Sequence, residues 1–408
     1  MNTQNLRQKN CWLSLFDLKI VISVLLLSLL GCREELNIND DSDNTDYELS
    51  DIVKGREQRL TKNDFRIGLN EKGLVSQRQR SYIKYGWPGS VYGAGLWISG
   101  YQNGEIRANV VGIGENTNSS FDPVIDSEVG EVYYVLPSMI ENPFNEWPES
   151  FPKNLQNEPK LFGSEMCWVQ LKSATSTLTG IHSAAFDGLS VSQSIYCLNE
   201  DASRNAVFIR YEIENKSEFD LRDVYLGFYR DIDLFFGSTN GDYVGYDSQW
   251  QISYTFSKEY PPEINRLVGV GCAVLKTDEQ IGAGVELYSH RYITRGDSTR
   301  FGEGVLTPES AYWALKGLDN NGDDMINPVS GETTRYALDG NPISRDGWVD
   351  DARDSRALIS VGPISLESYG KTELLIVIYV AYGSDLSSLI TNIKLIGSNL
   401  ISNPGLWL

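Results

Sequence analysis

Apolar and polar residues alternate with a period of two along much of the chain. Between Val207 and Glu214 the odd-numbered positions are all apolar, whereas Arg210, Glu212 and Glu214 occupy even-numbered positions. Successive side chains of a β-strand point to opposite faces of a sheet, so this pattern predicts a strand. Similar runs, separated by Gly, Pro, Asn and Asp, occur at residues 65–69, 91–98, 106–111, 132–136, 166–171, 189–198, 224–228, 252–256, 267–275, 357–366 and 372–382. They predict an all-β fold, an antiparallel β-sandwich that is either one extended sandwich or two adjoining ones.

One strand is expected at the centre of a sheet. The segment Leu374–Val380 is apolar at every position and contains no charged residue. A strand covered on both faces has this composition, because neither of its faces meets water. It follows the run 357–366, and Ser368-Tyr369-Gly370 joins the two. The glycine of this joint is expected to supply the positive φ of a tight turn.

The period changes to that of a helix near the C-terminus. Ser384-Asp385 offers an N-cap, and apolar residues recur at helical spacing from Leu386 to Ile396. Gly397 is expected to end the helix, because glycine commonly follows a helix C-terminus. The sequence therefore predicts one short C-terminal helix, packed on the sandwich.

The first 32 residues have the pattern of an export signal. Basic residues precede an apolar run from Ile20 to Leu30, which is shorter than a comfortable membrane-spanning helix. The run ends in Leu29-Leu30-Gly31-Cys32, which resembles the bacterial lipobox. The resemblance implies that Cys32 carries a covalent lipid that anchors the chain in a membrane. The alternative is an uncleaved N-terminal anchor helix with an incidental cysteine.

Acidic residues dominate the chain, with 55 Asp and Glu against 35 Lys and Arg. Removal of residues 1–31 takes away three basic residues and one acidic residue, which leaves 32 basic and 54 acidic residues, a net charge of −22. Such a surface repels nucleic acid, so a nucleic-acid partner is excluded. From Arg33 to Ile52 the chain holds eight acidic residues and little apolar periodicity, which predicts a solvated tether.

We therefore expect four regions. These are a lipoprotein signal peptide at 1–31, an acidic tether at 32–60, an N-terminal β-rich region at 61–200 and a β-sandwich region at 201–400 that includes the terminal helix. No repeat of fixed period is present.

Several short stretches together resemble a family of secreted and surface β-sandwich proteins from Gram-negative bacteria that use the type IX secretion route. They are Asn63–Ile67, Gly93–Ile98, Gly104–Arg107, Gly188–Gln193, Val207–Lys216, Asp231–Asp233, Gly241–Asp247, Gly317–Asp323 and Ser360–Pro363. The acidic pair Glu34-Glu35 after Cys32 looks like the surface-export signal of lipoproteins in these bacteria. The resemblance implies a cell-surface location on the outer membrane and assigns no chemistry. An ordinary acidic linker on a lipoprotein that faces the periplasm is the other interpretation.

Two acidic constellations are candidate calcium sites. The first places oxygen side chains at Asp319, Asn321, Asp323 and Asn327, with the spacing of a short calcium loop. Asp324 stands where an EF-hand has glycine and Ser330 stands at its twelfth position, so the loop is not an EF-hand. Asp350 or Asp351 could complete the shell. A polar turn without an ion is the alternative.

The second constellation consists of Asp231, Asp233, Asp242 and Asp247, which flank a loop after a strong strand. Asp231 and Asp233 would share one strand face. Nearby carboxylates repel one another unless a proton, water or a cation intervenes, so calcium is one interpretation. A solvated loop and a carboxylate pair for glycoside hydrolysis are the others.

Other residue types carry less information. Cys167, Cys197 and Cys272 are either buried thiols or include one disulfide, for which Cys167 with Cys197 is the candidate. His182 and His290 are expected to be surface or structural residues, because no catalytic motif accompanies them. The tryptophans could stack on sugars, although core positions are typical of a sandwich. They are Trp87, Trp97, Trp147, Trp168, Trp250 and Trp348.

Two hypotheses of function follow. The first is a surface-exposed outer-membrane lipoprotein that acts as a non-enzymatic binding, display or structural module with calcium-stabilised loops. The second is a glycan-binding or glycan-cleaving accessory lipoprotein. No catalytic residue is assigned in either, and the protein or glycan partner is not identified by the sequence.

Overall fold

The computed structural model describes residues 51–76, 91–113, 119–124, 131–174, 179–198, 203–234, 241–260, 264–295, 301–302, 307–351 and 354–407. They belong to one compact unit, Leu49–Leu408. The signal peptide, Cys32, the tether up to residue 50 and Trp87 lie outside the described residues. Among the described residues, no helix is long and apolar enough to cross a membrane.

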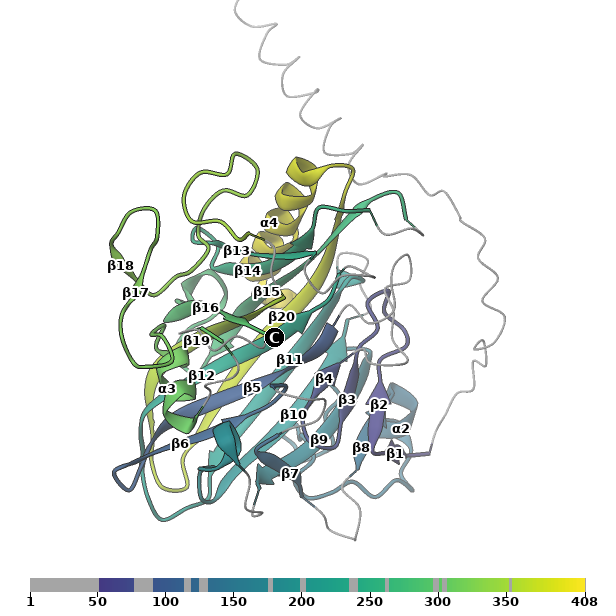
Figure 1. Cartoon of the computed structure of the whole chain (residues 1–408). Helices are drawn as coiled ribbons and strands as arrows, with labels where there is room; N and C mark the ends of the chain where they lie inside the picture. The colour runs from purple at the N-terminus through teal and green to yellow at the C-terminus, as the bar shows by residue number, and fades with distance from the viewer. Residues whose placement is uncertain are drawn as a thin grey trace, which may run out of the picture. The chain divides into compact units, whose positions relative to one another are not determined.

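Two antiparallel sheets form the sandwich (Figure 1). The ten-stranded sheet runs in the order β1 (Val53–Gly55), β8 (Val132–Val135), β9 (Glu165–Ser173), β10 (Leu189–Cys197), β11 (Ala206–Asn215), β20 (Lys371–Gly383), β15 (Leu267–Thr277), β14 (Ile252–Ser257) and β13 (Asp242–Asp247), with β7 (Phe121–Pro123) on β9. The eight-stranded sheet runs β16 (Ser289–Thr294), β19 (Ser355–Leu366), β12 (Leu221–Ile232), β5 (Val91–Gln102), β4 (Val75–Ser76), β3 (Gly68–Asn70) and β2 (Glu57–Arg59), with β6 (Glu105–Val110) on β5. Both sheets contain strands from 61–200 and from 201–400. The predicted antiparallel β-sandwich is confirmed.

The alternation along β20 shows how the layers are arranged. Leu374, Ile376 and Ile378 belong to the apolar core between the two sheets. Leu375 and Val377 belong to a second apolar cluster, on the opposite face of the same sheet. Both faces are therefore buried, and β20 lies between β11 and β15. This confirms the central strand expected from the continuous apolar run. Each such side chain contributes about 1.5–3 kcal/mol of stability when it is buried.

The outer face of the ten-stranded sheet is covered by α4 (Leu386–Ser402), drawn in yellow in Figure 1. Asp385 caps its N-terminus as predicted, and the capping box is completed by Ser388. The predicted end at Gly397 is wrong. The helix continues for five more residues because Leu400 and Ile401 also bury their side chains against this sheet.

Gly397 lies inside α4 because the helix comes very close to β20 there. A Cβ at this position would clash with Oη of Tyr379 and lie 2.5 Å from Ile252 Cδ1. Oη of Tyr379 donates a hydrogen bond to the carbonyl oxygen of Ile393 at 2.8 Å. The glycine thus permits close packing rather than ending the helix.

The outer face of the eight-stranded sheet is partly covered by α3 (Pro308–Leu315), which the sequence analysis did not predict. Thr307 is its N-cap and forms a capping box with Ser310. Leu315 packs with Trp97 and Tyr229 of the sheet. The remaining elements are short: α2 (Pro137–Glu141), η1 (Gly180–His182), η3 (Gly282–Gly284), η5 (Pro404–Leu406) and the hairpin of β17 (Met325–Ile326) and β18 (Thr333–Thr334).

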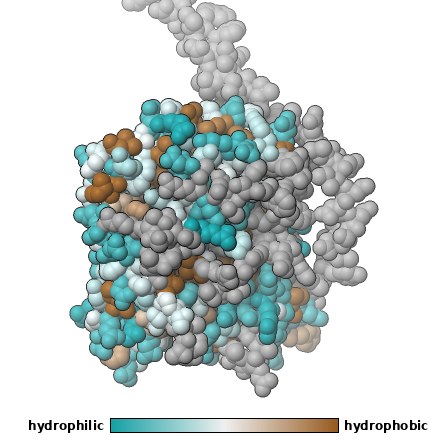
Figure 2. Space-filling view, viewed as in Figure 1, coloured by the Kyte–Doolittle hydropathy of each residue, from teal (hydrophilic) through white to brown (hydrophobic). Residues whose placement is uncertain are grey.

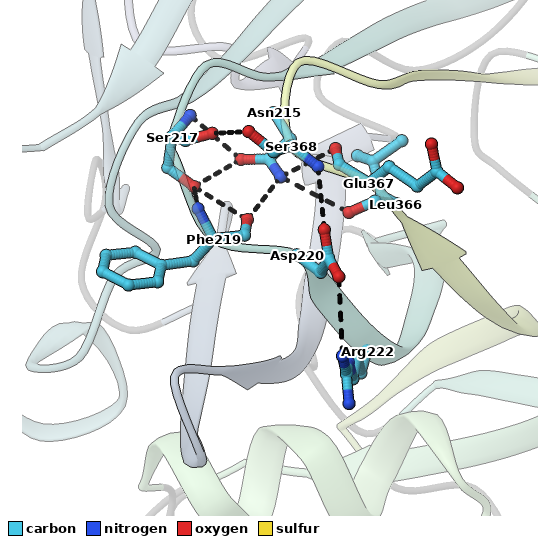
Figure 3. A network of polar contacts seen from close by, with 8 residues as sticks. All are labelled: Asn215, Ser217, Phe219, Asp220, Arg222, Leu366, Glu367 and Ser368. Carbon is cyan, nitrogen blue, oxygen red and sulfur yellow. Dashed lines mark hydrogen bonds and ion pairs between the residues drawn. The ribbon is translucent and has the colours of Figure 1, made fainter.

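Two connections that cross from one sheet to the other lie side by side. One leads from β11 to β12 and the other leads from β19 to β20. A network of polar contacts around Asn215 joins the two connections (Figure 3). The joint at residues 368–370 therefore links two sheets. Positive φ occurs at Tyr369, at 62°, and not at Gly370 as expected.

The three cysteines of the described residues are buried free thiols. In the register of β9 and β10, Cys167 lies opposite Ile195 and Cys197 lies opposite Glu165. The two cysteines are thus diagonal neighbours, and the disulfide considered between them is not formed.

Candidate metal centre

Three carboxylates converge where β12 ends and β19 begins. The two strands are antiparallel neighbours, with Arg230 opposite Ala357, so residues that follow β12 meet residues that precede β19. Carboxylate oxygens of Asp231, Asp233 and Asp354 all lie within 4.8 Å of one another. The structure therefore brings together the first two predicted residues, and it adds Asp354.

Two guanidinium groups border this acidic cluster. Nε of Arg356 lies 3.1 Å from Oδ2 of Asp231, and its Nη1 lies 2.8 Å from Oδ1 of Asp354. Nη1 of Arg295 lies 3.3 Å from Oδ2 of Asp354. Asp231 and Arg356 are both almost fully buried, so this is an ion pair in a region of low dielectric.

Asp242 approaches the cluster from the other sheet, at the start of β13. Its side chain is only 3% exposed, and its Oδ1 accepts a hydrogen bond from the Leu234 amide at 2.9 Å. Burial, and then repulsion from Asp233, Asp231 and Asp354, raise the pKa of Asp242 to about 8, against the effect of the Leu234 amide. Burial is also the main cause that raises the pKa of Asp233. These two carboxyls therefore resist ionisation in the absence of a further cation.

The arrangement suits a cation or a shared proton. Four carboxyl groups meet two guanidinium groups, so full ionisation leaves an excess of negative charge that a hard divalent cation would neutralise. The oxygen separations of up to 4.8 Å are shorter than the roughly 6.5–9.5 Å of an inverting glycosidase pair and close to the roughly 5–5.5 Å of a retaining pair, so the distance argues against the inverting geometry alone. Asp231 and Asp354 are both paired with arginine, which favours their ionised forms and does not suit a general acid.

The fourth predicted residue, Asp247, lies at the opposite end of β13 from Asp242. Its Oδ2 is 2.6 Å from Nζ of Lys394 in α4, and its Oδ1 accepts a hydrogen bond from the Trp250 amide at 2.9 Å. Asp247 therefore holds the turn after β13 against α4, and the structure does not bring it to the cluster.

The first predicted loop uses its oxygens for its own backbone. Oδ1 of Asp319 accepts hydrogen bonds from the amides of Asn321 and Asp323, at 2.8 and 3.0 Å. Oδ1 of Asn327 likewise accepts from the amides of Val329 and Ser330. These are the contacts of polar turns. Among the described residues, the groups of three or more acidic, histidine or cysteine ligands that could hold a metal do not include this loop.

A buried arginine, Arg291, forms hydrogen bonds to the same loop from the core side. Nη1 of Arg291 donates to the carbonyl oxygen of Leu318 at 2.7 Å, and its Nη2 donates to Oδ1 of Asn320. Asn321 and Asp323 are exposed. Asp350, considered as a further ligand here, instead accepts a hydrogen bond from the Val244 amide at 2.8 Å.

Both histidines are buried. Nδ1 of His290 lies 2.7 Å from the carbonyl oxygen of Ala337, which can only accept, so Nδ1 carries the proton. Oγ of Ser253 then donates to Nε2 at 2.6 Å and accepts from Nη2 of Arg230, also at 2.6 Å. These residues are sealed in the core, so the serine and histidine hold the sandwich together at a place closed to a substrate.

Sequence reasoning missed Asp354, Arg356 and Arg295. The stretch that precedes β19 is rich in charged residues. This charge points to the cluster with Asp231 and Asp233 only when the pairing of β19 with β12 is known. Strand pairing across more than a hundred residues is not encoded in a local pattern.

No protein-family model matches the chain, and no curated protein sequence matches it. Among solved structures, the chain is similar to a polysaccharide lyase, with 8% sequence identity, a TM-score of 0.32, and coverage of 85% of this chain and 34% of that one. It is also similar to a bacterial glucoamylase complexed with acarbose, with 9% identity, a TM-score of 0.31, and coverage of 84% and 34%. The chain thus spans about a third of the length of these proteins. At this overlap the similarities carry no argument about function.

Among the residues coloured in Figure 2, hydrophilic residues are frequent and apolar residues lie scattered between them. Among the large apolar side chains of the described residues, Phe144 and Leu155 are the most exposed, at 90% and 101%. Scattered exposed apolar residues are ordinary on a protein surface.

Proposed function

We propose that the protein is a lipid-anchored lipoprotein of a bacterial outer membrane, displayed at the cell surface as a non-enzymatic binding or structural module. In this proposal calcium stabilises one end of the β-sandwich. The observation that carries the location is Leu29-Leu30-Gly31-Cys32, followed after Arg33 by Glu34-Glu35. Acyl chains on one cysteine supply buried methylenes at about 0.8 kcal/mol each, so two or more chains anchor a protein stably.

The anchor is tested by mass spectrometry of the protein purified from membranes. We expect Cys32 to be the first residue and to carry acyl chains, and we expect Cys32→Ser to move the protein out of the membrane fraction. Cys11→Ser is the matched control and leaves the fractionation unchanged. An unacylated Cys32 in the membrane-derived protein contradicts the proposal.

The surface location needs its own test, because the acidic residues after Cys32 also suit a periplasm-facing lipoprotein. Treatment of intact cells with a protease is expected to digest the protein, whereas a periplasmic marker survives. Glu34→Ala together with Glu35→Ala is expected to leave the anchor intact and to protect the protein from the protease. Full protection of the unaltered chain contradicts the surface location.

The charge balance of the acidic cluster supports calcium. Asp231, Asp233 and Asp354 present oxygens within 4.8 Å of one another, and Asp242 adds a fourth carboxyl that burial makes costly to ionise. Calcium takes six to eight oxygen ligands, and carboxylates are prominent among them. A bound ion stabilises the fold by about 2.7 kcal/mol when its free concentration is a hundred times its Kd.

The calcium site is tested by thermal unfolding in calcium and in a chelator. We expect a higher midpoint in calcium and loss of that difference in Asp233→Asn. Asp324→Asn, which changes an exposed carboxylate outside the cluster, is the control. Asp323→Asn tests the other predicted loop, and loss of the calcium response there alone would move the site to that loop. An unchanged midpoint in the unaltered protein contradicts calcium binding.

A further inference from the structure

A cavity of about 70 Å³ lies where the turn between β13 and β14 meets η3 and the end of α4. A single water needs roughly 10–15 Å³ on this scale, so the cavity has room for several waters or for the ring of a small ligand. It is smaller than the sites of about 300–1,000 Å³ that hold drug-sized molecules. Val274, Leu287 and Ile401 are buried apolar residues of its lining.

The polar part of the lining comes from the turn that Asp247 holds. Trp250 is half-buried, and its backbone amide is bound by Asp247, whose other oxygen pairs with Lys394 of α4. Gln251 has a φ of 56°, a conformation that is costly for a residue other than glycine. The turn is thus held in one conformation by contacts on both sides of it.

The amide of Gln251 has a defined orientation. Its Oε1 accepts a hydrogen bond from the Leu287 amide at 2.6 Å, so Nε2 is the group left to donate. Among the described residues, no acceptor binds Nε2 of Gln251 or Nε1 of Trp250. Two N–H donors are therefore available to a ligand that brings acceptors, and the exposed amide of Gln249 also lines the cavity.

The lining contains no ionisable side chain, although the chain as a whole is strongly acidic. An anion would need a cationic partner and a cation would need a carboxylate, so neither is favoured here. A ligand with hydroxyl acceptors and an apolar ring face fits a lining of amides, aliphatic side chains and Trp250, which also packs against the apolar cluster beneath α4. We infer that this cavity binds one uncharged sugar residue of a glycan. The inference deepens the proposed binding role and is independent of both the lipid anchor and calcium.

The test uses saturation-transfer difference NMR on the full-length protein. The probes are methyl β-glucopyranoside, methyl β-galactopyranoside and methyl α-mannopyranoside, with glucuronate as the charged comparison. We expect saturation of the ring protons of at least one neutral glycoside and at least tenfold weaker binding of glucuronate. Ala283→Phe should abolish the signal, because it adds a ring at an exposed residue of the lining.

A second, milder variant keeps the inference testable if Ala283→Phe fails to fold. Trp250→Phe keeps an aromatic ring and deletes one donor, so we expect binding to weaken about three- to tenfold. Trp313→Phe on α3 is the control, and it should leave binding unchanged. Absence of saturation in every neutral glycoside overturns the inference, as does a signal that survives Ala283→Phe in the folded variant. Such a failure leaves the measurements on Cys32 and on calcium unaffected, so it is distinguishable from failure of the proposed function.

Discussion

The side-chain amide nitrogen of Asn215 donates a hydrogen bond to the carbonyl oxygen of Glu367 at 3.0 Å, across 152 residues of sequence. The same nitrogen donates to the carbonyl oxygen of Phe219 at 2.8 Å, and Oδ1 accepts from Oγ of Ser217 at 2.7 Å. One buried amide thus joins the connection from β11 to β12 with the connection from β19 to β20 (Figure 3). Both passages between the sheets depend on it.

Asn215→Ala is expected to lower the free energy of unfolding by about 2–4 kcal/mol, because it removes a buried amide and leaves partly buried carbonyl oxygens without a donor. Urea unfolding measures the loss. Asn154→Ala is the matched control, since Asn154 also binds backbone amides but lies on an exposed loop. We expect a loss below about 1 kcal/mol there. Equal losses in the two variants would contradict a special role for Asn215.

The two histidines should make the fold sensitive to acid. Burial lowers the pKa of His290 to about 3 and that of His182 to about 4, below the ordinary value of 6.5. The unfolded chain therefore binds these protons more tightly than the folded chain. The stability that the neutral histidines contribute is complete above pH 6.5 and is lost as the pH falls towards 4 and 3.

The histidine resonances of the native protein provide the measurement. We expect neither imidazole to titrate between pH 8 and 5 in NMR spectra. His182→Gln should remove up to about 1.4 kcal/mol per pH unit from the slope of stability against pH below 6.5. A native histidine that titrates near pH 6.5 would contradict the assignment.

Gly397→Ala should destabilise the protein, although alanine is about 1 kcal/mol better than glycine in an exposed helix. The added Cβ would meet Oη of Tyr379, so we expect a net loss of about 1–3 kcal/mol. Gly405→Ala is the control, because a Cβ there meets nothing within 4 Å. Combination with Tyr379→Phe should recover part of the loss in a double-mutant cycle, and strictly additive losses would exclude this contact as the cause.

Glu165, in β9, fastens the segment that follows β2 to the ten-stranded sheet. Its Oε1 accepts from the amide and hydroxyl of Thr61, both at 2.8 Å, and from Oη of Tyr134 at 2.6 Å, while Oε2 accepts from the Lys62 amide at 2.9 Å. Glu165→Gln replaces one acceptor by a donor, so the Lys62 amide or the Thr61 groups lose their partner.

We expect Glu165→Gln to cost about 2–3 kcal/mol and to expose the bonds after Arg59 and Lys62 to trypsin. Limited proteolysis followed by mass spectrometry locates the cuts. Glu332→Gln, at an exposed position, should leave the digestion pattern unchanged. Cleavage that begins elsewhere in the chain in Glu165→Gln would argue against this fastening.

Local patterns predicted most strands and the start of α4, because side-chain periodicity and capping are properties of neighbouring residues. They misplaced the end of α4, since Gly397 looks like a terminator until its closeness to Tyr379 is known. They also omitted α3, which has only eight residues, about two turns, and is therefore too short to show a helical period. Of the second acidic constellation, Asp231 and Asp233 could be grouped from their spacing, whereas Asp354 belongs to a segment more than a hundred residues away.

The sequence by itself determined the sheet-built fold, the central position of β20 and the candidate lipid site at Cys32, because each depends on a short run of residues. The tertiary structure alone decided which strands are neighbours. It separated Asp247 from the other carboxyls, added Asp354 and two arginines to them, and placed the turn at Trp250 beside the end of α4. Antiparallel pairing over long sequence separations sets these contacts, and that pairing arises from the packing of whole faces rather than from any local sequence signal.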